Sequence, residues 1–290
     1  MAAEPPIREP APAKINLYLH VTGRRPDGYH LLDSLVVFCD TGDRIEACAA
    51  GTLSLDYAGP FAADLPAPED NLVMRAAHEL AQTFEISKGA RLTLFKSLPV
   101  ASGIGGGSAD AAAVLRALIR LWRIDPEDGR LAKLALSLGA DVPVCLMTRP
   151  AIMRGIGEDL QLLPSFPELP LVLVNPGTGV STPAVFKART GDFSLAFDWP
   201  SGTVTADEVP GILDGTMNDL QVPAIAIAPV IADTLEVLQA QTGHLLARMS
   251  GSGATCFALF ESTSAAHTAA HAIADAYPGW WVQAATVYGA

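Results

Sequence analysis

Four glycines crowd one short stretch in the first half of the chain. The sequence Gly103-Ile104-Gly105-Gly106-Gly107-Ser108 stands directly before an alanine-rich segment that has the composition of a helix. Glycine lacks a Cβ, so the amides of such a loop approach an anion closely, and the positive end of the following helix points to the same place. A plain strand-to-helix turn is the alternative, but the number of glycines favours a phosphate-binding loop.

Two common phosphate loops do not fit this stretch. A Walker loop ends in Gly-Lys-Ser/Thr, and no lysine precedes Ser108. A Rossmann fingerprint requires glycine at the position of Ser108, which argues against a dehydrogenase. A second small-residue loop, residues 250–254, could approach an anion or the first loop closely. Two such loops in separate halves of the chain suggest a site between two domains.

The composition limits the possible partners and location. Half of the 290 residues are apolar and 17% are charged, with a formal net charge of −12 and only five lysines. This acidic balance argues against a broad nucleic-acid surface but not against one small anion pocket. Four cysteines form no CxxC pair, and the sequence shows neither a signal peptide nor a membrane span. We therefore expect a soluble cytoplasmic protein that binds no nucleic acid or membrane and needs no obligate protein partner.

The elements that position these residues are strands and helices in mixed order, which predicts an α+β fold. A loop rich in glycine and proline suggests two domains, residues 1–155 and 156–290. Apolar patterning predicts strands over residues 15–22, 29–38, 43–48, 52–57, 91–95, 142–147, 151–154, 171–175 and 281–287. Residues 248–260 are expected to form a glycine turn that leads into a further strand. The same patterning and capping signals predict helices over residues 72–84, 108–122, 126–138, 225–241 and 265–276.

The segment Pro99-Val100-Ala101-Ser102-Gly103-Ile104-Gly105-Gly106-Gly107-Ser108-Ala109 resembles the central motif of the GHMP kinases, a family of small-molecule kinases, with Ile104 in place of leucine. Three further motifs agree in order: Pro12-Ala13-Lys14-Ile15-Asn16-Leu17, Arg25-Pro26-Asp27-Gly28-Tyr29-His30 and Gly139-Ala140-Asp141-Val142-Pro143. They resemble the branch that phosphorylates a cytidine-diphosphate-linked sugar alcohol in the non-mevalonate isoprenoid pathway. The resemblance implies an N-terminal domain of the ribosomal protein S5 domain 2-like type and a ferredoxin-like C-terminal domain.

The resemblance also implies roles in phosphoryl transfer. Asp141 becomes the candidate general base, although its spacing alone would suit a turn aspartate. Lys14 becomes its cationic partner, which would keep Asp141 ionised and gather charge on the moving phosphoryl group. Residues 99–109 would hold the phosphates of ATP, with Lys96 and Asn71 as further nucleotide contacts. Asn71 is equally well explained as a helix cap. Mg²⁺ should accompany ATP, but the sequence identifies no ligand for it.

On the acceptor side, the resemblance implies a pocket for cytosine and a contact to the reacting hydroxyl. Tyr29 and Phe186 would stack on the base, His30 would bond to its edge and Thr182 would join the pocket. Asn16, on the same strand face as Lys14, would contact a substrate hydroxyl. Each residue also has an ordinary structural explanation. Tyr29 could be a packed aromatic, His30 a surface imidazole and Asn16 an amide that bonds within a turn.

Two other functions remain open from the sequence. Another GHMP kinase, such as a homoserine or mevalonate kinase, would have no base for Tyr29, His30 and Phe186 to bind. A non-catalytic ligand sensor with the same fold would not need both Lys14 and Asp141. We therefore expect the kinase with the cytidyl acceptor.

Overall fold

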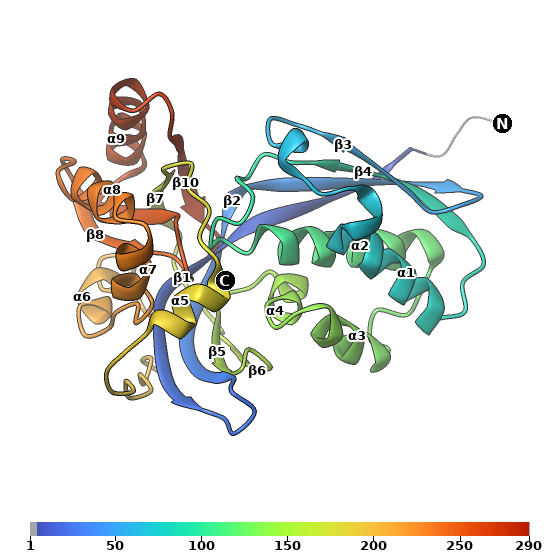
Figure 1. Cartoon of the computed structure of the whole chain (residues 1–290), viewed down its shortest axis with the longest axis horizontal. Helices are drawn as coiled ribbons and strands as arrows, with labels where there is room; N and C mark the ends of the chain where they lie inside the picture. The colour runs from blue at the N-terminus through green and yellow to red at the C-terminus, as the bar shows by residue number, and fades with distance from the viewer. Residues whose placement is uncertain (1–4, 290) are drawn as a thin grey trace. The chain divides into compact units, whose positions relative to one another are not determined.

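The computed structural model describes residues 5–289, and they form two compact units, each built from separate segments of the chain (Figure 1). The first unit contains residues 5–13 and the segments Gly42–Val100 and Gly105–Thr148. The second contains Lys14–Thr41, Ala101–Ile104 and residues 149–289. The glycine stretch identified in the sequence therefore contributes residues to both units.

The elements follow the mixed order expected of an α+β protein. The strands are β1 Ile7–Arg24, β2 His30–Ala50, β3 Ser54–Ala58, β4 Gly89–Phe95, β5 Ala151–Gly155, β6 Asp159–Leu162, β7 Leu169–Asn175, β8 His244–Met249, β9 Cys256–Phe260 and β10 Trp281–Val287. The helices are α1 Leu72–Thr83, α2 Gly106–Trp122, α3 Arg130–Leu138, α4 Val142–Met147, α5 Thr182–Ala188, α6 Val209–Leu213, α7 Gln221–Ile227, α8 Val230–Gln239 and α9 Thr263–Ala276.

In the first unit, helices pack beside a sheet that contains β3, β4 and the second half of β2 (Figure 1). β4 pairs antiparallel with β2 and parallel with β3. Asn71 caps α1, because its Oδ1 accepts the amide of Val73 at 2.9 Å. The alanine-rich α2 is buried along most of its length, and α1 packs against it. Small alanine side chains permit this close approach, so α2 is held firmly behind the glycine loop that precedes it.

The second unit contains a four-stranded antiparallel sheet in the order β10-β7-β9-β8. Helices α5 to α8 connect β7 to β8, and α9 connects β9 to β10. This β-α-β-β-α-β arrangement with the last strand beside the first is ferredoxin-like, as predicted. β2 also pairs in this unit with β5, which pairs in turn with β6.

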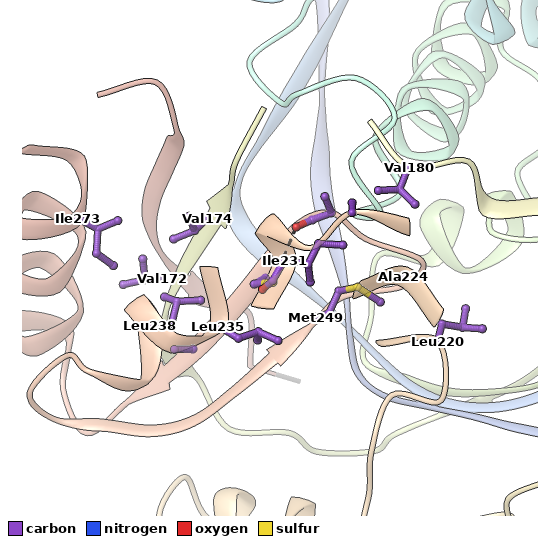
Figure 2. Packing of buried hydrophobic residues seen from close by; sticks show 14 of the residues in the cluster. Val172, Val174, Val180, Leu220, Ala224, Ile231, Leu235, Leu238, Met249 and Ile273 are labelled. Carbon is purple, nitrogen blue, oxygen red and sulfur yellow. Dashed lines mark hydrogen bonds between the residues drawn. The ribbon is translucent and has the colours of Figure 1, made fainter. Parts of the chain in front are cut away.

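One apolar cluster fills the space between this sheet and its helices (Figure 2). Val172 and Val174 of β7 face Ile231, Leu235 and Leu238 of α8 within it, and α9 adds Ile273. Ile231 and Leu238 have no exposed surface. Alternation along β7 and the spacing of three to four residues along α8 bring these side chains to one core.

Four expectations about the elements were wrong. The strands expected over residues 29–38 and 43–48 form one continuous strand, β2. Residues 142–147 form the helix α4, not a strand, since Pro143 in its first turn has the backbone angle a helix start requires. The helix expected over 225–241 is two helices, because Pro229 disfavours helical geometry at Ala228 before it. The helix expected from residue 126 begins only at Arg130, since Asp125 and Asp128 accept amides two residues ahead and form turns.

Candidate active site

The last part of the glycine stretch begins helix α2. Gly105 is the N-cap with a φ of 67°, a left-handed conformation that suits glycine. The amide of Ala109 donates the first intrahelical bond, to Gly105 O at 2.8 Å. The amides of Gly106, Gly107 and Ser108 therefore precede any intrahelical acceptor and are available to an anion. A Cβ added to Gly107 would meet no atom within 4 Å, so the space on the side-chain side of this residue is open.

The earlier part of the stretch lies against the second glycine loop, within the second unit. A Cβ on Gly103, whose φ is 77°, would stand 2.6 Å from Gly253 O and 2.8 Å from Ser250 O. Thr255 N donates to Ser102 O at 3.1 Å, and Ser250 Oγ donates to Gly103 O at 3.3 Å. The sequence prediction that the second loop approaches the first closely is thus confirmed.

Lys96 and Asn71, the further nucleotide candidates, are both buried in the first unit. Lys96 Nζ donates to Asp43 Oδ2 at 2.6 Å and to Asp110 Oδ2 at 2.7 Å. Burial opposes the charge of Lys96, but the carboxylates of Asp110 and Asp43 outweigh it and raise its pKa. Asn71 is occupied as the cap of α1, which was the alternative explanation for it. Nucleotide contacts by Lys96 and Asn71 stay predictions.

The two catalytic candidates lie in different units. Asp141 is half-buried and occupies the N-cap position of α4 in the first unit. Lys14 is 4% exposed on β1, and its amide donates to Ile104 O at 3.0 Å in the second unit. Their roles as base and cation stay predictions.

Asn16 is held by the second glycine loop and by β2. Its backbone N donates to Ser250 Oγ at 3.1 Å, and its side-chain Nδ2 donates to Ser34 Oγ at 2.7 Å. Its Oδ1 is buried and has no hydrogen-bond donor among the described residues. A fixed amide with an unpartnered acceptor is consistent with the contact to a hydroxyl group that the resemblance implies.

Three of the four residues predicted for the base pocket, His30, Phe186 and Thr182, contact another side chain in the second unit. His30 and Phe186 stack on each other, with ring centroids 4.9 Å apart and planes 22° apart. Thr182 Oγ1 lies 2.7 Å from Ser252 Oγ, in the second glycine loop. Tyr29 is 62% exposed at the end of the turn between β1 and β2. Burial, followed by two neighbouring arginines, lowers the pKa of His30 below 6.5, so the ring is neutral at pH 7.

Sequence reasoning assigned no role to four buried residues that support these loops. Asp43 and Asp110 surround Lys96, as described above. Asn218 Nδ2 donates to Met249 O at 2.7 Å and to Gly251 O at 2.8 Å, holding the second glycine loop. Arg248 donates to Leu17 O, Leu213 O and both oxygens of Thr216 at 2.7–3.2 Å. Their partners are distant in sequence, so no local pattern pointed to them.

Family models match both halves of the chain. The model described as GHMP kinases N terminal domain matches residues 71–149, and that described as GHMP kinases C terminal matches residues 210–279. The fold and the candidate site therefore define a small-molecule kinase of this class. The predicted domain boundary at residue 155 falls between the two matched regions and stays a prediction.

Individual relatives narrow the class. The chain is 57% identical to the 4-diphosphocytidyl-2-C-methyl-D-erythritol kinase of Cereibacter sphaeroides (strain KD131 / KCTC 12085), over 96% of this chain and 98% of that one. It is 51% identical to the same kinase of Paramagnetospirillum magneticum, over 94% and 95% of the two chains. A crystal structure of 4-(cytidine 5′-diphospho)-2C-methyl-D-erythritol kinase matches with a TM-score of 0.82 and 35% identity, over 98% of this chain and 100% of that one. The chain belongs to the GHMP kinase family and, within it, to the 4-diphosphocytidyl-2-C-methyl-D-erythritol kinases. The expected two-domain α+β architecture of that family is confirmed.

Neither a metal cluster nor a membrane helix occurs in the part of the chain that the structure describes. Residues 5–289 contain no group of three His, Cys, Asp or Glu side chains placed to hold a metal ion. None of their helices is long and apolar enough to cross a membrane.

Proposed function

We propose that this chain transfers the terminal phosphoryl group of ATP to the 2-hydroxyl of 4-diphosphocytidyl-2-C-methyl-D-erythritol. The products are the 2-phosphate and ADP, and the step belongs to the non-mevalonate route to isoprenoid precursors. The observation that carries the proposal is identity above 50%, over nearly the whole chain, to kinases named for this acceptor. The four motifs that resemble the family lie within the matched length.

The N-terminal turn of α2 supports ATP as the phosphoryl donor. The amides of Gly106, Gly107 and Ser108 have no intrahelical acceptor, and a Cβ at Gly107 would meet no atom, which is consistent with a phosphate chain at this turn. ATP, when bound, supplies the phosphoryl group. The task of residues 99–109 is to fix the phosphates and offset their charge, since positioning and electrostatics account for most of the catalysis of phosphoryl transfer.

Asp141 and Lys14 are proposed as the two catalytic side chains. Asp141 accepts the proton of the acceptor hydroxyl, or orients that hydroxyl for in-line attack. Lys14 contributes the positive charge that favours an ionised carboxylate and a more negative phosphoryl group. Asn16 is proposed to contact the acceptor hydroxyl, and its buried Oδ1 without a donor supports this role.

The proposed acceptor pocket uses Tyr29, His30, Thr182 and Phe186. A neutral imidazole at His30 both donates and accepts hydrogen bonds, as the edge of a cytosine requires. One face of Phe186 is covered by His30, so a bound base would contact the exposed ring of Tyr29 or the remaining face of Phe186.

Mg²⁺ is proposed to accompany ATP without an assigned protein ligand. Phosphate oxygens and water, with one or two carboxylates, commonly hold Mg²⁺. Residues 5–289 contain no group of three possible metal ligands, so we name no side chain for the ion. A cytoplasmic location likewise stays a proposal from the sequence.

Replacing Asp141 by Asn tests the proposed chemistry. The amide is similar in shape but cannot take a proton, so we expect phosphoryl transfer to fall by at least a hundredfold. The thermal unfolding midpoint and the Kd for a non-hydrolysable ATP analogue should stay within error of the parent chain. Turnover within threefold of the parent would remove Asp141 from the mechanism.

A further inference from the structure

Two buried carboxylates share one ammonium next to the proposed phosphate loop. Lys96, Asp43 and Asp110 each have side chains 3% exposed or less, and the Lys96 Nζ distances to the two carboxylates are 2.6 and 2.7 Å. All three belong to the first unit. A buried charge needs a partner, and here one ammonium lies between two carboxyl groups, so the cluster is neutral only when one carboxyl group is protonated.

The cluster connects three elements that meet at the loop. Asp43 lies on β2, Lys96 directly follows β4, and Asp110 lies in the first turns of α2. Asp43 Oδ1 also accepts the amides of Ser97 at 2.6 Å and Leu98 at 2.8 Å, which are the last residues before Pro99. Asp43 therefore fixes the path of the chain into the glycine loop, and Asp110 fixes the helix that leaves it.

The side of the cluster toward the helix start is tightly filled. A Cβ on Gly106 would stand 3.1 Å from Lys96 Nζ. The ammonium thus lies directly behind the amides to which we assign the phosphates.

We infer that Asp43 and Asp110 are positioning residues for the nucleotide: by holding Lys96 between them they fix the geometry and the charge behind the phosphate loop. The inference rests on the proposed function of this loop. It assigns roles to two carboxylates outside the predicted site. In this role Lys96 supports the phosphate loop from behind and does not need to contact adenosine.

The electrostatics of Asp110 support this inference. Its Oδ1 is buried without a hydrogen-bond partner among the described residues. Burial raises the pKa of Asp110 to about 8, Lys96 opposes the shift and Asp43 adds to it. Below that pH, Asp110 is protonated and the cluster is neutral, because the negative charge of Asp43 balances the positive charge of Lys96. Above it, the cluster gains a negative charge behind the loop, which repels a triphosphate.

The two carboxylates allow contact and charge to be separated by Asp→Asn variants. Asp43→Asn cannot accept from both Lys96 and the Ser97 and Leu98 amides, so the connection breaks. Asp110→Asn keeps an oxygen for Lys96 and places its amide at the unpartnered position, so the contact is kept and the side chain can no longer ionise. Asp128→Asn is the matched control, since Asp128 pairs with Arg130 at the surface of the same unit.

The experiment measures Kd for adenosine 5′-(β,γ-imido)triphosphate and for cytidine 5′-diphosphate between pH 6.5 and 9.5, with full-length protein. We expect Asp43→Asn to weaken binding of the ATP analogue at least tenfold and of cytidine diphosphate less than twofold. The parent chain should bind the analogue progressively more weakly above pH 8, and Asp110→Asn should lose this dependence. Asp128→Asn should match the parent throughout.

Several results would overturn the inference. Both ligands weakening equally in Asp43→Asn would indicate general loss of structure, and binding within twofold would show that the cluster does not position the loop. If Asp43→Asn does not fold, the pH profile of Asp110→Asn decides alone, and a profile that follows the parent rejects the role. A parent chain that binds no ATP analogue would instead reject the proposed function.

Discussion

Removing the side chain of Tyr29 should weaken binding of the cytidyl acceptor without affecting ATP. The ring is 62% exposed, so folding leaves most of it in water and its apolar surface contributes little to the core. The turn beneath it is held by the main chain: Arg25 N donates to Tyr29 O at 2.7 Å, and Tyr29 N donates to Asp27 Oδ1 at 3.2 Å. Tyr29→Ala preserves both bonds, so the fold should be retained.

The size of the effect follows from the stacking contribution. A base on an aromatic ring is worth about 1–3 kcal/mol, and about 1.4 kcal/mol corresponds to a factor of ten. KM for the cytidyl acceptor should therefore rise by about 5- to 150-fold, while KM for ATP stays within twofold. Tyr29→Phe should retain most of the affinity, because it keeps the ring face.

The assay is steady-state ADP release with each substrate varied at saturation of the other. Tyr277→Ala is the matched control: Tyr277 is 38% exposed in the same unit and stacks on Trp280 with centroids 4.2 Å apart. It should leave both KM values unchanged. Equal increases in both KM values for Tyr29→Ala, or an increase of the same size in Tyr277→Ala, would refute the assignment of Tyr29 to the base.

Three further substitutions or titrations test the supporting structure. Gly103→Ala should lower the free energy of unfolding by about 1–2 kcal/mol because of the φ of 77° alone, and by more because the new Cβ clashes with Gly253 O. Gly202→Ala is the control, since its Cβ would meet no atom within 4 Å. Equal urea midpoints for the two variants would contradict the packing of the loops. Arg248→Met should cost about 3–5 kcal/mol in urea unfolding, because it leaves buried carbonyls without donors, and a loss under 1 kcal/mol would show that they find other partners. By NMR, the His30 imidazole should titrate with a pKa below 6.5. Its contribution to stability is therefore present above pH 6.5 and is lost as the pH falls through the folded-state pKa. A midpoint at or above 6.5 would contradict the effect of burial and the neighbouring arginines on this pKa.

The parts of the fold that follow from short sequence patterns were predicted well. The cap at Asn71 and the apolar stripe behind it gave α1, and the glycines before an alanine-rich run gave the start of α2 within two residues. The short apolar runs at residues 171–175 and 281–287 gave the strands β7 and β10 of the second unit. In each case the side chains that decide the local structure are neighbours in sequence.

Elements that depend on distant contacts were predicted less well. The apolar run 142–147 suits a strand or a short buried helix, and only its packing beside α2 settles the choice. The two carboxylates around Lys96 come from positions 14 and 53 residues away from it in the sequence. Asp43 and Asp110 each look like ordinary polar residues until the fold brings them together.

The most direct test of the account is ADP release with ATP and Mg²⁺, in separate reactions with 4-diphosphocytidyl-2-C-methyl-D-erythritol, homoserine, mevalonate and galactose. We expect ADP and the 2-phosphate with the cytidyl alcohol alone. Release with another of these alcohols would keep the phosphate loop but discard the roles of Tyr29, His30 and Phe186. No release with any alcohol, from protein that binds ATP, would contradict the kinase and favour a ligand sensor.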